Sequence, residues 1–344
     1  MSAVTSLPIT IRMEKRSNMA NGTNRNATLH VERLKKYFPI TTGFFRKTTG
    51  WIRAVDEVSF SVAKGEIFGL VGESGCGKST LAKAVLGIYK PDDGWVDFNG
   101  NRISDLTSNR AKQIRNQIQY VYQDPGASLD PWWTIGRSLR EPMIIHTEMT
   151  RTEMDQRIHA ILTDVGLDPE HLSRYPHEFS GGQQRRLGLA RILTINPALI
   201  FFDEPTAGLD VSVQATILKL LKDIKERRGL TFIFISHDLG VIRMMCHRVA
   251  VMYLGRIAEI GPTGLIFNNP EHPYTQALMA AIPKPIVDPH AEDIILEGEP
   301  PRPDVLIPGC QFEPRCPAKF SHCMNKRPLL REIEPGHWLA CHRF

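Results

Sequence analysis

A glycine-rich stretch with one lysine and one hydroxyl pair carries the clearest chemistry in the sequence. It runs from Gly72 to Thr80 and reads G-E-S-G-C-G-K-S-T, which has the spacing G-x-x-x-x-G-K-S of a phosphate-binding loop. Glycines allow backbone N–H groups to turn toward phosphate oxygens, and the lysine supplies a fixed positive charge. We therefore expect Lys78 to reach the β- and γ-phosphates of a nucleotide and Ser79 to ligate Mg²⁺.

The residues on either side supply the structural context that a phosphate loop needs. Residues 67–71 form a short apolar run and predict a buried strand. Residues 78–86 predict a helix that ends at Gly87, and its N-terminus would add partial positive charge to the site. Cys76, inside the loop, is interpreted as a residue without chemistry that is exposed enough to oxidise.

Two adjacent carboxylates follow a second apolar strand. Residues 198–202 form an unbroken apolar run, typical of a parallel strand covered on both faces, and Asp203 and Glu204 come next. In phosphate-loop ATPases the acid after such a strand holds Mg²⁺, which is the role we expect for Asp203. Glu204 is then placed to take a proton from attacking water. The alternative is a strand-end pair that caps the next helix.

A second pair of glycines lies at the start of another predicted helix, over residues 182–194. This stretch offers one hydroxyl group and two glycines whose backbone N–H groups no side chain covers, and it comprises Ser180, Gly181, Gly182 and Gln183. By itself this pattern is a helix N-cap. As an anion site it is a second phosphate cradle, without a lysine.

These motifs, in this order, resemble those of the nucleotide-binding subunit of an ABC transporter over residues 29–262. The signature loop matches Ser180–Gln183, with Phe179 where Leu is more usual, and the Walker B acids match Asp203 and Glu204. The other matches are the Q-loop Gln123, the D-loop Ala207–Asp210, the switch histidine His237 and the adenine-stacking aromatic Phe38, with Tyr37 as its alternative. Six motifs in order make the resemblance specific.

The resemblance implies an α/β fold of the ABC type. It has a RecA-like P-loop core, an antiparallel β subdomain and a helical subdomain over about residues 124–197. Two such subunits would face head to tail, with ATP between the phosphate loop of one and the signature loop of the other. The catalytic residues implied are Glu204, His237 and Gln123, and the Mg²⁺ ligands are Ser79, Gln123 and Asp203. The nucleotide-binding residues implied are Phe38, Gly72, Ser74, Gly75, Cys76, Gly77, Lys78, Ser79, Thr80, Gln123, Asp203, Ser180, Gly181, Gly182, Gln183 and Asp210.

The C-terminal part narrows the resemblance to ATP-binding subunits of oligopeptide/dipeptide importers. Residues 267–275 and the cysteine-bearing tail from Gly309 carry this likeness. The resemblance implies that such a subunit energises import of peptides through two transmembrane permease subunits. It would pair with a second, related ATPase subunit as a heterodimer, with a homodimer as the alternative, and an extracytoplasmic solute-binding protein would deliver the substrate. Similar subunits serve nickel, oligosaccharides or opine-like compounds. The other alternative is a soluble non-transport ABC ATPase, and no nucleic acid is expected as a partner.

Trp132 and Trp133 lie where this family docks the coupling helix of a permease. They are interpreted as anchors in that groove or as core of the helical subdomain.

Cysteines gather in the tail. Four fall within 32 residues in the spacing C-x5-C-x6-C-x17-C, namely Cys310, Cys316, Cys323 and Cys341. Zinc sites usually bring ligands in close pairs such as C-x2-C, which this tail lacks. Four thiolates on irregular loops suit an iron–sulfur cluster, and tails of the resembled family can hold a [4Fe–4S] cluster. Zinc and four unligated thiols are the alternatives. Three nearby histidines are candidate replacement ligands: His322, His337 and His342.

Length and composition fit a globular protein of two units. The chain has 344 residues, and no stretch approaches the roughly 18 apolar residues of a membrane span. We expect a disordered basic tail over residues 1–28, the ATPase domain over residues 29–262 with a loop at 39–52, and a loop-rich C-terminal module over residues 263–344. The predicted location is the cytoplasmic face of the inner membrane, with peripheral attachment.

Overall fold

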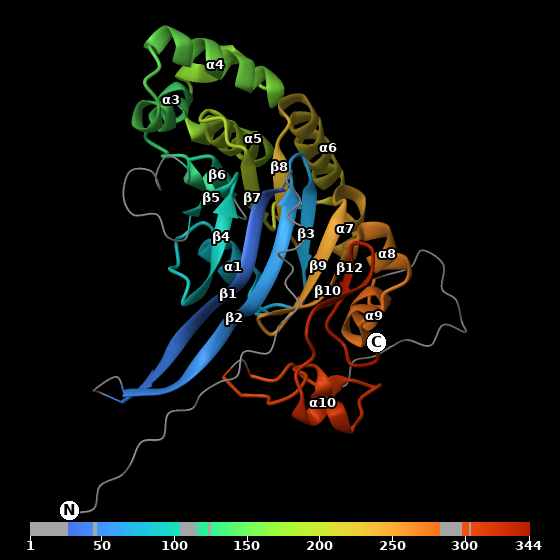
Figure 1. Cartoon of the computed structure of the whole chain (residues 1–344). Helices are drawn as coiled ribbons and strands as arrows, with labels where there is room; N and C mark the ends of the chain where they lie inside the picture. Colours follow the sequence, from blue (N-terminus) through green and yellow to red (C-terminus); the bar gives the residue numbers. More distant parts are fainter. Residues whose placement is uncertain are drawn as a thin grey trace, which may run out of the picture.

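Two β-sheets organise the chain, and helices cover them (Figure 1). The computed structural model describes residues 27–43, 47–103, 114, 116–122, 125–282, 298–302 and 304–344. Most of the predicted N-terminal tail therefore lies outside the described residues, and so does Gln123.

The larger sheet has eight strands in the order β11-β12-β10-β9-β3-β8-β7-β6. Their bounds are β3 Ile67–Val71, β6 Ile118–Val121, β7 Leu199–Asp203, β8 Thr231–Ile235, β9 Arg248–Tyr253, β10 Arg256–Pro262, β11 Arg331–Glu334 and β12 His337–Leu339. The strands from β9 to β6 pair in parallel. Every residue of β3 and β8 is buried, as their unbroken apolar sequences predict for strands covered on both faces.

The smaller sheet is antiparallel and has the order β2-β1-β4-β5. Its strands are β1 Ala27–Thr42, β2 Lys47–Ala63, β4 Asp93–Phe98 and β5 Asn101–Arg102. The predicted loop at residues 39–52 is wrong, because β1 and β2 continue through it and pair as far as Thr42 opposite Lys47. The glycines at 43 and 50 suggested a loop, but the β-branched residues around them favour an extended ladder.

The helices divide into a separate group and a set that covers the sheets. Their bounds are α1 Lys78–Val85, α3 Ile135–His146, α4 Arg151–Asp164, α5 Gly181–Leu193, α6 Val211–Arg228, α7 Leu239–Met245, α8 Thr263–Asn268, α9 Pro273–Ala280 and α10 Ser321–Asn325. Short 3₁₀ helices are η3 Pro125–Ser128, η4 Pro169–Ser173, η5 Pro176–Glu178 and η6 Glu313–Arg315. Helices α3, α4 and α5 pack together at one end of the molecule, away from α10 (Figure 1). Across the described ranges, none of these helices is long and apolar enough to cross a bilayer.

The C-terminal module, residues 263–344, is built onto the larger sheet. Strand β12 pairs with β10, and the module's buried residues include Phe312 and Leu339. The carboxylate of Glu259 on β10, which is fully buried, accepts the backbone N–H groups of Glu271 and His272. It also bonds to Nε2 of His337 at 2.8 Å. The buried residues of this loop-rich module therefore pack against the larger sheet. The α/β fold with an antiparallel sheet and a helical group is confirmed.

Candidate functional site

A cavity of about 580 Å³ lies where β3 and β7 end, and its volume is typical of small-molecule sites. The phosphate loop lines it from one side, and the ends of β7 and β8 line it from another. Predicted site residues that line this cavity are Phe38, Ser74, Gly75, Gly77, Lys78, Ser79, Thr80, Asp203, Glu204 and His237. The fold thus brings together residues that lie up to 199 positions apart in the sequence.

Two glycines of the phosphate loop have conformations and surroundings that exclude a side chain. Gly77 has φ +106°, and a Cβ there would lie 1.9 Å from the carbonyl oxygen of Ala54. Gly72 has φ +146°, and a Cβ would lie 2.1 Å from the carbonyl oxygen of Met252. Gly77 is also the N-cap of α1 and offers no side chain to cap it. The first N–H groups of α1 are therefore available to an anion in the cavity.

The ammonium group of Lys78 is held by the loop itself. It donates hydrogen bonds to the carbonyl oxygens of Gly72 at 2.8 Å and Glu73 at 2.9 Å. The Sγ atom of Cys76 lies 3.6 Å from the same ammonium. The prediction that Cys76 is exposed enough to oxidise is wrong, because its side chain turns into the core and the residue is 3% exposed. Burial raises the pKa of this thiol.

Tyr120, which was not predicted as a site residue, contacts both Asp203 and Ser79. The hydroxyl of Tyr120 on β6 donates to Oδ2 of Asp203 and also interacts with Ser79. Burial and the hydrogen bond to Asp203 raise the pKa of Tyr120. A hydroxyl and a carboxylate are the hard oxygen donors that Mg²⁺ prefers, so Ser79 and Asp203 fit that ion. Tyr120 belongs to no sequence motif, and it reaches Asp203 because β6 pairs in parallel with β7, which places Tyr120 opposite Phe201.

Glu204 and His237 meet at the edge of the cavity. Nδ1 of His237 lies 2.9 Å from Oε1 of Glu204. The backbone of Glu204 has φ +53°, a left-handed conformation that side-chain-bearing residues rarely adopt. Its N–H donates to the carbonyl oxygen of Ile235 at 2.8 Å, which holds this conformation. Such strain is typical of functional sites.

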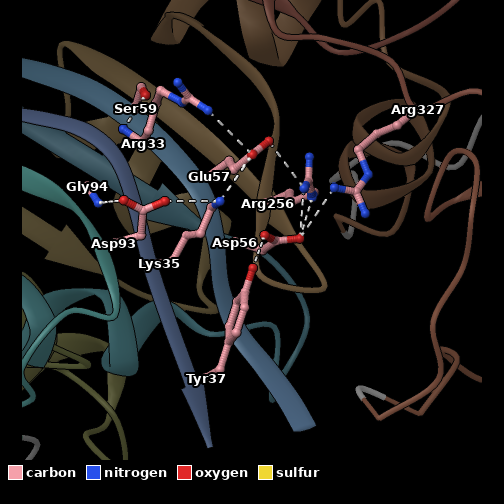
Figure 2. A network of polar contacts seen from close by, with 10 residues as sticks. All are labelled: Arg33, Lys35, Tyr37, Asp56, Glu57, Ser59, Asp93, Gly94, Arg256 and Arg327. Atoms are coloured by element: carbon pink, nitrogen blue, oxygen red, sulfur yellow. Dashed lines mark hydrogen bonds and ion pairs between the residues drawn. The ribbon is translucent and has the colours of Figure 1, made fainter. Parts of the chain in front are cut away.

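Phe38 and Tyr37 have different partners. Phe38 lines the cavity, whereas Tyr37 does not, and its hydroxyl donates to Oδ1 of Asp56 at 2.6 Å. Figure 2 shows this contact between Tyr37 and Asp56. Oδ2 of Asp56 accepts from Arg256 at 2.7 Å and forms an ion pair with Arg327 at 3.7 Å. Burial would raise the pKa of Asp56, but Tyr37 and the two arginines lower it. Phe38 is therefore the aromatic ring available to a ligand.

The signature-loop residues and Asp210 do not line this cavity. Ser180 caps α5 in a reciprocal capping box with Gln183, and a Cβ added at Gly181 or Gly182 would meet open space. Asp210 caps α6 by accepting the N–H of Val213. Within the described residues, one chain thus has a cavity at the phosphate loop and, at a separate place, the unobstructed N-terminus of α5.

The four tail cysteines are neighbours. The N–H of Cys310 donates to the carbonyl oxygen of Cys323 at 2.8 Å. Burial, with the other three cysteines contributing, raises the pKa of Cys310 to about 11. In the part of the chain that the structure describes, however, no three His, Cys, Asp or Glu side chains are arranged to hold one metal ion. His337 is engaged by Glu259, and Nε2 of His342 lies 2.7 Å from the carbonyl oxygen of Lys326.

Comparison with protein families gives two matches along the chain. Residues 55–207 match the family described as "ABC transporter". Residues 258–323 match "Oligopeptide/dipeptide transporter, C-terminal region".

Similar proteins cover nearly the whole chain. The oligopeptide transport ATP-binding protein AppF of Bacillus subtilis is 44% identical over 324 residues, which is 93% of this chain and 98% of AppF. The putative oligopeptide transport ATP-binding protein YkfD of the same organism is 44% identical over 324 residues, which is 92% of this chain and 95% of YkfD.

Solved structures share the fold of the ATPase part. The chain cbiO1 from Clostridium perfringens, part of the ABC transporter complex cbiONQ, has a TM-score of 0.62 at 27% identity and covers 71% of this chain and 92% of its own. The ATP-binding cassette MJ0796, solved as a dimer with ADP and Pi, has a TM-score of 0.59 at 27% identity, with 68% and 98% covered.

Proposed function

Because the chain belongs to the ATP-binding subunits of oligopeptide/dipeptide-type ABC transporters, we propose that its cavity binds ATP with Mg²⁺ and hydrolyses ATP to energise peptide import through a pair of permease subunits. The observation that carries this proposal is the convergence of Lys78, Asp203, Glu204 and His237 on one cavity. A regulatory subunit that does not hydrolyse ATP would have no need of this set.

Each side chain has a separate task in the proposed reaction. Lys78 and the N-terminus of α1 attract the phosphates, and Ser79 and Asp203 hold Mg²⁺. When bound, Mg²⁺ neutralises charge on the phosphate oxygens. Glu204 accepts the proton of the attacking water, and His237 donates a hydrogen bond to the γ-phosphate. Gln123, which lies outside the described residues, is proposed as a further ligand of Mg²⁺ or water.

The site is proposed to be completed by a second ATPase subunit. Ser180, Gly181 and Gly182 are available at the start of α5, away from the chain's own cavity, so in a head-to-tail pair they would meet the phosphates of the facing subunit. Asp210 would lie at the same interface. Closure would exclude water from the phosphates, and hydrolysis would remove the bridge that holds the pair together. The second subunit is proposed to be a related but different ATPase.

The docking site for the permeases is proposed near Trp132. This side chain is 86% exposed, so the core alternative is wrong for Trp132. The ring of Trp133 is covered by the guanidinium of Arg137 at 3.8 Å. An exposed tryptophan beside a covered one is suited to anchor a partner helix. The subunit would then sit at the cytoplasmic face of the inner membrane, and an extracytoplasmic binding protein would supply the solute.

The tail cysteines are proposed to hold a [4Fe–4S] cluster. The support is that four thiols, three on loops and Cys323 on α10, lie near one another and offer soft sulfur donors. Anaerobic purification should give iron and sulfide together, and Cys316→Ser should lose both while the buried control Cys246→Ser keeps both. Stoichiometric zinc without sulfide would replace the cluster with a zinc site. Protein free of any metal would leave four ordinary thiols.

The substrate class is tested by transport. The chain, its permeases and its partner ATPase are reconstituted in vesicles, and ATP-dependent uptake of a mixed peptide pool, Ni²⁺ and an oligosaccharide is compared. Uptake of peptides supports the proposal. Uptake of nickel or sugar in place of peptides would retain the ATPase role and reject the peptide. ATP hydrolysis without any solute uptake or permease binding would favour a non-transport ABC ATPase.

A further inference from the structure

Glu73, the second residue of the phosphate loop, is held by the C-terminal module. Its backbone N–H donates to the hydroxyl of Tyr274 on α9 at 2.9 Å. Its two carboxylate oxygens accept from Nη1 of Arg315 in η6 at 3.1 and 2.9 Å. Residues 201 and 242 positions later in the chain therefore fix one residue of the loop.

The two holding residues stand on a rigid base. Tyr274 is fully buried, and its ring centroid lies 4.6 Å from that of Tyr253 and 5.5 Å from that of Phe312. Phe312 also packs edge-on against Tyr253 at 5.3 Å. The Arg315 side chain is 7% exposed. Because packed aromatic rings have little freedom, the hydroxyl and the guanidinium are presented to the loop in fixed positions.

Stability of the fold is a poor explanation for Arg315. Among the described residues, its Nε atom is buried without a hydrogen-bond partner. A buried ion pair with an unsatisfied donor contributes little to the free energy of folding, and apolar residues of similar volume often do as well. The geometry therefore favours a role for Arg315 in holding Glu73 in a fixed position.

The position of Glu73 matters because its carbonyl oxygen holds Lys78. The Lys78 ammonium donates to this oxygen at 2.9 Å and to that of Gly72 at 2.8 Å. Tyr274 and Arg315 thus fix a peptide unit that in turn aims the lysine, although neither residue lines the cavity.

We propose that Tyr274 and Arg315 are positioning residues for ATP binding, through which the C-terminal module braces the phosphate loop and aims Lys78. This inference rests on the proposed ATP-binding role of the cavity. Lys78 contacts the phosphates before and during the reaction, so a misplaced lysine weakens binding of ATP in both states. The expected signature is a raised KM for ATP with a nearly unchanged kcat at saturating ATP.

The sharpest test removes single hydroxyl groups. Tyr274→Phe deletes the acceptor for Glu73 and keeps the ring. Thr275→Val is the matched control, because it removes a buried hydroxyl from the next residue of α9, and among the described residues this hydroxyl has no hydrogen-bond partner. We expect Tyr274→Phe to raise KM for ATP by about fivefold, the effect of one lost hydrogen bond, and Thr275→Val to change it by less than about twofold. The assay uses ATP hydrolysis by the full chain in its assembled transporter.

A second pair of variants tests the arginine. Arg315→Gln should raise KM for ATP by roughly tenfold, whereas Lys319→Gln, which loses a surface ion pair with Glu313 in the same module, should leave it unchanged. If Arg315 acts through Glu73, the effect of Arg315→Gln should shrink when Glu73→Gln is already present. Thermal melting without nucleotide reports whether each variant is folded.

The outcomes separate this inference from the proposed function. A wild-type transporter that neither binds nor hydrolyses ATP would overturn both. Normal wild-type hydrolysis with equal KM values for Tyr274→Phe and Thr275→Val would overturn the brace and leave the ATPase role intact. A fall in kcat in proportion to the loss of folded protein, with KM unchanged, would also overturn it, because that is the result of a purely structural role.

Discussion

Nδ1 of His237 lies 2.9 Å from Oε1 of Glu204, so the residue proposed to contact the γ-phosphate is hydrogen-bonded to the residue proposed to activate water. The histidine side chain is 67% exposed and comes from the loop after β8, whereas Glu204 directly follows the neighbouring strand β7 and has a left-handed conformation. The hydrogen bond orients the carboxylate. The contact uses Nδ1 of the imidazole, so Nε2 remains for a phosphate.

The first prediction removes this partner. His237→Ala should lower ATP turnover by roughly 100-fold, because the γ-phosphate loses a donor and the Glu204 carboxylate loses its orienting contact. ATP affinity should change little, since Lys78 and the loop supply most of the phosphate contacts. Turnover and equilibrium ATP binding are measured side by side, with the exposed His159→Ala on α4 as control. Undiminished turnover in His237→Ala would remove His237 from the mechanism.

The second prediction concerns Tyr120. Removing its hydroxyl with Tyr120→Phe frees the Asp203 carboxylate to rotate, and loss of such an outer contact typically weakens metal binding about 10-fold or more. The Mg²⁺ concentration for half-maximal ATP hydrolysis should rise accordingly. Tyr122→Phe is the control, because this exposed ring packs edge-on against Tyr120 at 4.7 Å. Identical Mg²⁺ curves for the two variants would show that Tyr120 does not orient Asp203.

The third prediction is a pH dependence of stability from His272. Burial lowers the pKa of this side chain from 6.5 to about 4, and its Nδ1 accepts the N–H of Tyr274 at 3.1 Å. Between these two pKa values the unfolded chain binds a proton that the folded chain does not, so stability is present above 6.5 and is lost as the pH falls toward 4. The loss between about pH 7.5 and about pH 5 should be about 2 kcal/mol.

His272→Asn provides the comparison, because asparagine keeps the capping acceptor without titrating. Urea unfolding of both proteins at the two pH values should show a smaller loss for the variant. Equal losses of stability in the two proteins would mean that His272 takes up a proton as readily in the folded chain as in the unfolded chain, which contradicts the prediction.

The sequence predicted the parts of the site in which backbone geometry dictates residue type. A Cβ atom at Gly72 or Gly77 would lie 2.1 or 1.9 Å from a carbonyl oxygen, so the fold requires glycine at both positions. The spacing of these glycines therefore indicated the phosphate loop in the sequence. The buried parallel strands were recognisable for a similar reason, since a strand covered on both faces has no polar side.

Contacts between side chains that are far apart in the sequence could not be predicted from local patterns. Tyr120 reaches Asp203 because β6 pairs with β7, and Arg315 reaches Glu73 from a segment whose Phe312 packs against Tyr253 and Tyr274. Neither residue belongs to a local pattern that signals its partner. The extended hairpin of β1 and β2 was missed because glycines at 43 and 50 suggest a loop, whereas the cross-strand ladder that overrides them is a contact between segments.

The measurement that tests the central claim most directly is ATP hydrolysis by the assembled transporter with Lys78→Ala. The phosphate loop loses its fixed cation, so turnover should fall by at least about 100-fold, and ATP-driven uptake should fall with it. Lys83→Ala, on the same helix α1 but not lining the cavity, should retain both activities. Wild-type turnover and uptake in Lys78→Ala would contradict the assignment of this cavity as the site of ATP hydrolysis.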